Sequence, residues 1–331
     1  MNHLATLEKT DLQLGYIPLL DCIALLWAEH QGYFTEVGLN VTLVKEASWA
    51  SLRDRLAFGF LDAAHCLSAI LPAAAIGDDQ LGIELQTSLV LSRNQAFISL
   101  SQHLCDELKI SSQDCPQRIA RQIIETIQQG RLLQLAHVFK HSIHHYSLRE
   151  WFALVDEDFA KDYPLNTLPP PYMVEAISKQ MVDGFCVGEP WNIQAQIQGY
   201  SQVVCASKQI IPDLADKVLA TTSEWAGRYP NTLNALLYAV QRAQQDLDHL
   251  QSLTEVWHIL EQHNIIQFHC SNLVHVEHFY KSQNIIRSFG VQHLPATVDF
   301  EWIIQQMCKW QNIQLDATQI KAIARQCVES I

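Results

Sequence analysis

In the first 65 residues, hydrophobic patterns typical of strands alternate with patterns typical of helices. Alternating apolar positions over 12–17 predict a strand, and apolar positions over 23–30 recur at helical spacing. Residues 41–44 predict a second strand and residues 60–65 a third, with a helical pattern between them. Because parallel neighbours need a crossover connection, this order predicts a parallel sheet covered by helices.

The rest of the chain continues with mixed patterns and then becomes helical. The polar residues 92–95 separate two extended stretches and suit a crossover between two lobes. The last hundred or so residues have helical periodicity, which predicts that the chain is almost wholly helical after a short strand at 203. The other predicted elements are helices at 67–76, 115–130, 147–155 and 172–181, and strands at 83–91, 96–100, 132–139 and 182–188.

Ligands in sheets of this kind collect where the strands end at their carboxyl side. Three segments lie there: residues 17–21, the Ser48-Trp49 turn, and the loop at His65. At the second, Trp49 lies near the free N–H groups of a helix N-terminus, which suit an anion, and its indole N–H is a further donor. The alternative is structural, with Ser48 capping the helix beside a packed aromatic ring. The local sequence leaves both interpretations open.

The composition limits the classes of partner. With 331 residues the chain can form two lobes, and Lys+Arg 22 against Asp+Glu 35 gives a net charge of −13. Such an acidic chain is a poor candidate for direct nucleic-acid binding through a broad basic face, but a few aimed donors can still bind a small anion.

The N-terminal residues are polar and acidic, without a basic segment followed by an apolar one, and no apolar run approaches the roughly 20 residues that span a bilayer. We therefore expect a cytoplasmic protein without a membrane segment. The nine cysteines are scattered, with no Cys-x-x-Cys pair, so we expect neither a disulfide framework nor a thiolate zinc site.

Several motifs occur in a fixed order along the chain. They are residues 15–21 with 28–34, Ala47-Ser48-Trp49 with Arg53-Asp54, residues 62–65, and Gly188-Glu189-Pro190-Trp191-Asn192. This set resembles the nitrate- and bicarbonate-binding proteins of the nitrate-transport family, over residues 11 to about 250. The resemblance implies an α/β fold of two lobes, the type II periplasmic-binding-protein fold, with a mainly parallel sheet and flanking helices in each lobe. Lobe I would hold residues 1–94 and 203–331, lobe II residues 95–202, and the ligand would bind in the cleft between them.

The resemblance also implies a ligand set of four residues. The family's pocket tryptophan matches Trp49, its glutamine matches Gln95, its histidine matches His144 and its lysine matches Lys217. His141 and His145 are neighbours that could take the place of His144. Without the resemblance, the expectation for Lys217 is an exposed lysine, and for a glutamine after a strand a solvated side chain.

These four residue types fit nitrate, a small planar anion that accepts hydrogen bonds and donates none. The implied site offers N–H donors and one cation, which compensates the charge of a buried anion. A lysine favours nitrate or nitrite over bicarbonate, because the bicarbonate binders resemble this site with a carboxylate at that place. The clustered histidines His141, His144 and His145 could suggest a metal site, but no carboxylate or cysteine lies at helical spacing from them. We therefore predict neither a metal nor a cofactor.

Three functions are compatible with these features. The resemblance, with the absence of an export signal, favours a cytoplasmic nitrate/nitrite sensor of the NasS type, whose ligand releases a NasT-like RNA-binding antiterminator with an ANTAR domain. The alternative is the solute-binding subunit of an ABC-type nitrate transporter. A pyrimidine-synthesising enzyme family shares the general fold, but the sequence offers no nucleophile or cofactor lysine in a supporting context, so we do not expect an enzyme.

Overall fold

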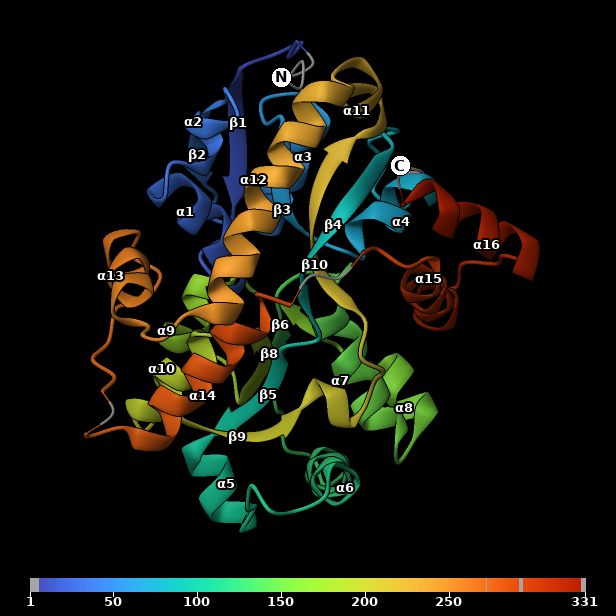
Figure 1. Ribbon diagram of the computed structural model, residues 1–331. Helices are drawn as coiled ribbons and strands as arrows, with labels where there is room; N and C mark the ends of the chain where they lie inside the picture. Colours follow the sequence, from blue (N-terminus) through green and yellow to red (C-terminus); the bar gives the residue numbers. More distant parts are fainter. Residues whose placement is uncertain (1–5, 272, 292–293, 329–331) are drawn as a thin grey trace.

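The structure, a computed structural model, describes residues 6–271, 273–291 and 294–328. It contains two five-stranded sheets, each flanked by helices, and the two lobes lie one above the other in Figure 1. The predicted two-lobed α/β architecture is confirmed, but each sheet mixes parallel and antiparallel pairs and is not mainly parallel as expected.

Lobe I is built on the sheet with the strand order β2-β1-β3-β10-β4. Strands β1 and β2 pair in parallel, as do β1 and β3, whereas β10 runs antiparallel to both of its neighbours. The five strands are β1 Asp11–Tyr16, β2 Asn40–Lys45, β3 Ala63–Leu67, β4 Leu85–Arg93 and β10 Ala215–Thr222. The helical elements around and between them are η1 Leu20–Cys22, α1 Ile23–His30, α2 Tyr33–Glu36, α3 Trp49–Ala57, α4 Ile70–Ile76, α11 Ser223–Arg228 and α12 Pro230–His249.

Lobe II is built on the sheet with the order β7-β6-β8-β5-β9, which also mixes parallel and antiparallel pairs. Its strands are β5 Ala96–Ser101, β6 Leu135–His137, β7 Asn166–Thr167, β8 Gly184–Gly188 and β9 Ser201–Ala206. Its helical elements are α5 Gln102–Leu108, α6 Pro116–Gln128, α7 Ile143–Ala153, α8 Glu157–Asp162, η2 Pro170–Tyr172, α9 Met173–Ser178, α10 Trp191–Ile197 and η3 Ser207–Gln209.

Four further helices complete the chain: α13 Thr254–Gln262, α14 Val276–Ser288, α15 Thr297–Gln311 and α16 Ala317–Gln326. Helix α12 lies against the upper sheet in Figure 1, while α14, which contacts it, reaches down beside the lower one. Helix α15 contacts α4 in lobe I and α7 in lobe II. Among the described residues, none of the helices is both long and apolar enough to cross a bilayer.

The chain passes between the lobes twice, and the two passages lie side by side. The first joins β4 to β5 through Asn94 and Gln95, and the second joins β9 to β10. The backbone N–H of Asn94 donates to the carbonyl of Leu214 (3.1 Å), and its side-chain amide donates to the carbonyl of Pro212 (2.8 Å). These two hydrogen bonds tie the passages together. Strand β9 pairs with β5 in lobe II, so the expected boundary between residues 202 and 203 would fall inside this strand.

Two elements differ from the sequence-based expectation. Strand β10 lies where the chain was expected to be almost wholly helical, and it occupies an inner position of the lobe I sheet. Its adjacent charged residues, Asp216 and Lys217, obscured the strand pattern, because charged side chains seldom occupy a buried strand unless they are paired. Helix α7 begins at Ile143, four residues earlier than expected, because the Ser142 hydroxyl caps it by accepting the N–H of His145.

Candidate functional site

Lys217 is fully buried in the middle of β10. Its ammonium nitrogen lies 2.7 Å from Oδ2 of Asp216 and 3.3 Å from Oδ2 of Asp21, and it makes no hydrogen bond of normal geometry within the described residues. Burial alone would lower the pKa of Lys217, but the two carboxylates outweigh burial and raise it. The lysine expected from composition alone to be exposed is therefore a buried cation.

Asp21 links the ends of several strands of lobe I. Its Oδ1 accepts a hydrogen bond from Nε2 of His65 (2.8 Å) and its Oδ2 one from the hydroxyl of Ser92 (3.0 Å). Burial raises the pKa of the Asp21 carboxyl, but Lys217 and His65 oppose it and hold this pKa well below its usual range. Asp21 is thus the ionised partner of the cluster.

Asp216 is the second buried acid. Burial raises its pKa and nearby Asp21 adds to the effect, while Lys217 offsets only part of it. The cluster therefore contains one cation, one firmly ionised carboxylate and one carboxyl group that holds its proton more tightly than usual.

Trp49 satisfies both interpretations of its turn. Ser48 caps α3 by accepting the N–H of Ser51 (3.2 Å), as the structural interpretation predicts. The Trp49 ring is buried beside His65, with ring centroids 5.7 Å apart, and Lys217 Nζ lies 5.8 Å from the Trp49 ring centroid. Its indole Nε1 nevertheless has no hydrogen-bond partner among the described residues. The three strand ends expected to hold a ligand, at Asp21, Trp49 and His65, therefore do meet.

His144 reaches the cluster from lobe II. It lies in the first turn of α7 and is fully buried, and neither ring nitrogen has a hydrogen-bond partner in the described structure. A Cβ on Gly188 would lie at ordinary contact distance, 4.0 Å from Nε2 of His144 and 3.5 Å from Leu19, so Gly188 lies beside both residues where the lobes approach. Burial, reinforced by Lys217, lowers the pKa of His144 well below its usual value, and the neutral ring offers one N–H donor at neutral pH.

The neighbouring histidines have protein partners elsewhere. Nε2 of His141 lies 2.7 Å from Oδ2 of Asp78, and Nδ1 of His145 lies 3.3 Å from Nε2 of His137. Within the described residues, His144 is thus the one of the three whose two ring nitrogens both lack a partner. In the same part of the chain, no group of three or more His, Cys, Asp or Glu side chains is arranged to hold a metal ion.

Gln95 is the predicted ligand that the structure does not connect to the others. It lies half-buried in the first passage between the lobes, and its Nε2 lies 3.3 Å from the hydroxyl of Ser288 at the end of α14. No recorded contact joins it to Trp49, His144 or Lys217, so its role as a ligand stays a prediction. Sequence reasoning did not name Asp216 as a member of the cluster, and it placed His65 there only as part of a loop at a strand end.

The two lobes touch directly beside this cluster. The N–H of Leu20 donates to the carbonyl of Glu189 (2.8 Å), and the Trp191 indole donates to the carbonyl of Pro18 (3.1 Å). A small pocket of about 230 Å³ lies at this junction; it is lined by Pro18, Lys45, Glu46, Ala47, Pro171, Tyr172, Trp191, Asn264 and Gln267. The cluster is enclosed, so a ligand can enter only when the lobes separate.

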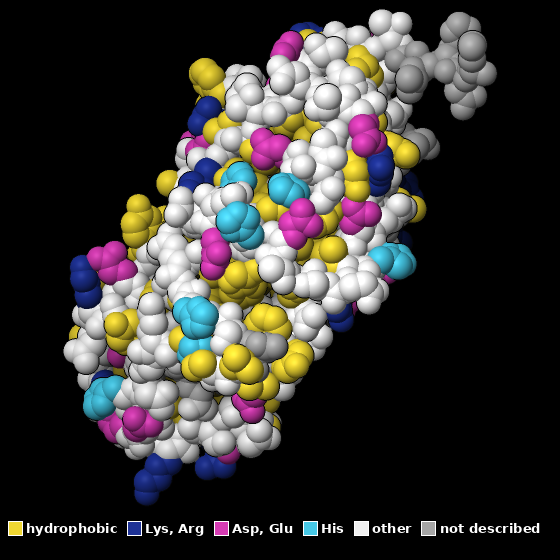
Figure 2. Space-filling view, turned by 60° about the vertical axis from the view of Figure 1, so that its left-hand side comes forward, with side chains coloured by type: hydrophobic (Ala, Val, Ile, Leu, Met, Phe, Trp, Pro, Cys, Tyr) yellow, Lys and Arg dark blue, Asp and Glu magenta, His cyan; other side chains and the backbone are white. Residues whose placement is uncertain are grey.

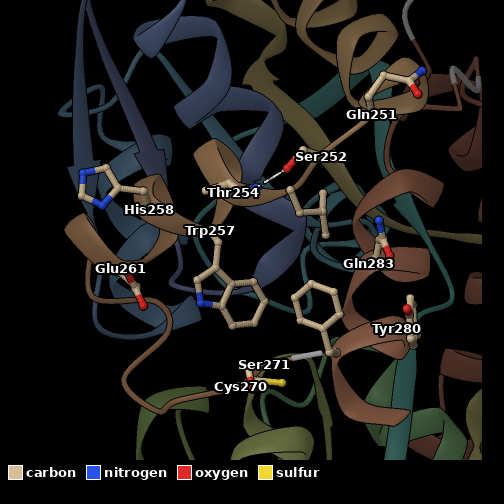
Figure 3. Close-up of a pocket in the computed structure, with 12 residues that line it drawn as sticks. Gln251, Ser252, Thr254, Trp257, His258, Glu261, Cys270, Ser271, Tyr280 and Gln283 are labelled. Atoms are coloured by element: carbon tan, nitrogen blue, oxygen red, sulfur yellow. Dashed lines mark hydrogen bonds between the residues drawn. The ribbon is translucent and has the colours of Figure 1, made fainter. Parts of the chain in front are cut away.

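A wider pocket of about 700 Å³ lies elsewhere, between α13 and α14. Figure 3 shows Trp257, His258 and Glu261 of α13 on one side of it and Tyr280 and Gln283 of α14 on the other. None of the predicted ligand residues lines this pocket, so its larger size does not make it a better candidate for the ligand site than the buried cluster.

Trp49 Nε1, Lys217 Nζ and His144 are buried donor groups without a hydrogen-bond partner of their own in the described structure. Buried polar groups are rarely left unpaired, because each such group costs about 1–3 kcal/mol. Contributed by both lobes, these donors suit a small ligand rich in acceptors.

The model of the NMT1-like family matches residues 5–261. The chain belongs to the NMT1-like family. Its relatives include the nitrate/nitrite binding protein NrtA of Synechococcus elongatus, 31% identical over 77% of this chain and 59% of that protein. The bicarbonate transport ATP-binding protein CmpC of the same species is 30% identical over 97% of this chain and 48% of that protein. The chain thus spans about half the length of CmpC.

Solved structures agree on the fold. The periplasmic nitrate-binding protein NrtA from Synechocystis PCC 6803 superposes with a TM-score of 0.80, at 24% identity, over 98% of this chain and 87% of that chain. The alkanesulfonate-binding protein SsuA from Xanthomonas axonopodis pv. citri, bound to MOPS, gives a TM-score of 0.69 at 13% identity, over 98% and 99% of the two chains. The predicted periplasmic-binding-protein fold is confirmed, and the NrtA relatives are named as nitrate/nitrite binding proteins, in line with the prediction against an enzyme.

Replacing Lys217 by Met will strongly destabilise the protein, because Asp21 and Asp216 will lose their shared cation. Removing one partner of a buried ion pair costs about 3–5 kcal/mol in the free energy of unfolding. The double variant Lys217→Met/Asp216→Asn will lose less, because one of the two uncompensated carboxylates is gone. Urea unfolding of both variants measures the difference, and a single variant as stable as the unmodified protein would contradict the account of the cluster.

Proposed function

We propose that the protein binds nitrate or nitrite between its lobes, with Trp49, His144 and Lys217 as donors and Gln95 as a fourth ligand. The observation that supports the ligand class is the set of three buried donor groups, one of which is the Lys217 cation. Nitrate and nitrite present acceptors only, so they can satisfy these groups without leaving a donor of their own unpaired. Relatives named as nitrate/nitrite binding proteins support the same ligand.

The carboxylates near Lys217 favour a singly charged anion over a more highly charged one. Asp21 already compensates the lysine, so an added anion is tolerated most easily when Asp216 is protonated. Binding of nitrate would then be accompanied by proton uptake.

We further propose that the protein acts as a cytoplasmic sensor of the NasS type. In this proposal, the ligand-free form holds a NasT-like ANTAR antiterminator inactive, and nitrate or nitrite releases it. A ligand shifts such an equilibrium only by its difference in affinity for the two forms, and a site made of both lobes binds tightly only when they are closed. The net charge of −13 supports contact with a basic RNA-binding partner.

Calorimetric titration with nitrate, nitrite and bicarbonate tests the ligand. We expect saturable binding of nitrate or nitrite, and Trp49→Phe will weaken it about 10- to 100-fold, because one hydrogen bond to a charged ligand contributes about 1.5–3 kcal/mol. Trp257→Phe, a tryptophan of α13 outside the site, is the matched control and will bind normally. Lys217→Glu, if it folds, will abolish nitrate binding. Equal affinity of Trp49→Phe and the unmodified protein would remove Trp49 from the site.

The affinity will rise as the pH falls. The charges of Lys217, Asp21 and His65 influence the pKa of Asp216, and Asp216 in turn raises the pKa of Cys186. The pKa of Asp216 is already raised, and an anion beside Lys217 raises it further. The complex therefore binds more protons than the free protein, and the affinity gains up to about tenfold per pH unit for one proton. Titrations in buffers of different ionisation enthalpy count the protons. Asp216→Asn will remove the uptake, and a pH-independent affinity with no proton uptake in the unmodified protein would refute the coupling.

Copurification with the antiterminator tests the sensor proposal. The two proteins will copurify without ligand and separate on addition of nitrate or nitrite, and Trp49→Phe will need a correspondingly higher concentration of the anion. A complex that the anion does not affect, formed by a protein that binds the anion, would contradict the sensor. Absence of any complex, with the protein found in the periplasm, would support the solute-binding subunit of a transporter instead.

A further inference from the structure

Helix α14 is anchored to lobe I at its C-terminal end. Ile285, Ile286 and Phe289 are buried in the same hydrophobic cluster as the apolar face of α12. The Gln244 side chain, from α12, donates to the carbonyls of Val90 (3.1 Å) and Phe289 (3.2 Å), which links this end of α14 to strand β4.

The packing there leaves little freedom. A Cβ added to Gly290 would lie 2.3 Å from the backbone nitrogen of Asp248, so the chain after α14 passes against the end of α12. The Arg287 guanidinium also donates to the carbonyl of Leu250 (3.1 Å). Helix α14 will therefore move with lobe I when the lobes separate.

The middle of α14 contacts lobe II through Lys281. The ammonium of Lys281 lies 2.6 Å from Oε1 of Glu189 and 3.9 Å from the ring centroid of Phe97 in β5. The side chain of Glu189 is only 1% exposed, and its other oxygen accepts the backbone N–H of Ile193 (3.0 Å). A buried carboxylate needs a compensating charge, and in the described structure Lys281 provides it.

Glu189 lies where the lobes meet over the ligand cluster. Its backbone carbonyl accepts the N–H of Leu20, the residue before Asp21, and the preceding Gly188 lies against Leu19 and His144. The Lys281–Glu189 pair and the contacts that enclose the site therefore form and break together.

We propose that Lys281 is an interlobe latch, a positioning residue that contacts no ligand but stabilises the closed lobes and so sets the affinity of the site. Because α14 moves with lobe I and Glu189 with lobe II, the ion pair exists only in the closed form. The apparent dissociation constant is the intrinsic one divided by the fraction of closed protein, so losing the latch weakens binding without touching the site. The measurement of affinity rests on the proposed anion ligand, whereas the measurement of lobe closure without ligand does not.

The test compares three variants of the full chain. Lys281→Met keeps a long, unbranched side chain beside Phe97 and loses the charge, and Lys281→Arg restores the charge. Lys179→Met is the matched control, because Lys179 also pairs with a glutamate, Glu175, but within one exposed helix of lobe II. Each variant is titrated with nitrate and nitrite, and its radius of gyration is measured by small-angle X-ray scattering with and without the anion.

For Lys281→Met we expect a dissociation constant about tenfold weaker, a larger radius of gyration without ligand, and recovery of the compact form at saturating anion. Lys281→Arg will restore most of the affinity, and Lys179→Met will behave as the unmodified protein. A dissociation constant within twofold of the unmodified value would overturn the latch, even if thermal stability falls. If the unmodified protein binds neither anion, the ligand proposal fails. The radius of gyration of ligand-free Lys281→Met then decides alone: an increase over the unmodified protein supports the latch, and no increase overturns it.

Discussion

The arrangement of both lobes around the site depends on the burial of one ammonium group. Lys217 lies on an inner strand of the lobe I sheet, where an uncompensated cation would be costly, so carboxylates must converge on it. Asp21 comes from the turn after β1, Asp216 from β10 itself, and His65 from β3 adds the hydrogen bond that orients Asp21. The ends of the first three strands are held together by this electrostatic requirement and by the packing of Trp49 against His65.

The same cluster makes the site dependent on both lobes. Lobe I supplies the cation, its carboxylates and the indole, whereas lobe II supplies His144 from the first turn of α7. The backbone and indole hydrogen bonds of Glu189 and Trp191 close the lobes at this point. Two adjacent passages of the chain, tied by Asn94, leave the lobes joined on one side, as hinge-type closure requires. Binding and closure are thus parts of one equilibrium in this proposal.

Much of this architecture could be predicted from the sequence, because it rests on local signals. Alternating and helical hydrophobic patterns predict the order of elements through β3, and the strand-end rule places residues 17–21, Trp49 and His65 together. The resemblance to known motifs added Lys217 and His144, which the structure finds buried and close enough to influence each other.

The rest depended on contacts between distant residues. Strand β10 was missed because Asp216 and Lys217 belong in a buried strand only once Asp21, nearly two hundred residues away, neutralises the lysine. The pairing of His141 with Asp78 and of His145 with His137 separates three histidines that the sequence presents as equivalent. For Gln95 the motif predicts a ligand residue, but in the structure its side chain forms a hydrogen bond with Ser288 of α14.

The most direct test of the central claim is a crystal structure of the protein grown with saturating nitrate. The account predicts electron density for a planar anion enclosed between the lobes, within hydrogen-bond distance of Trp49 Nε1, a ring nitrogen of His144 and Lys217 Nζ. Density for the anion at another place, or a cluster in which Lys217 contacts only Asp21 and Asp216 at saturating nitrate, would contradict it.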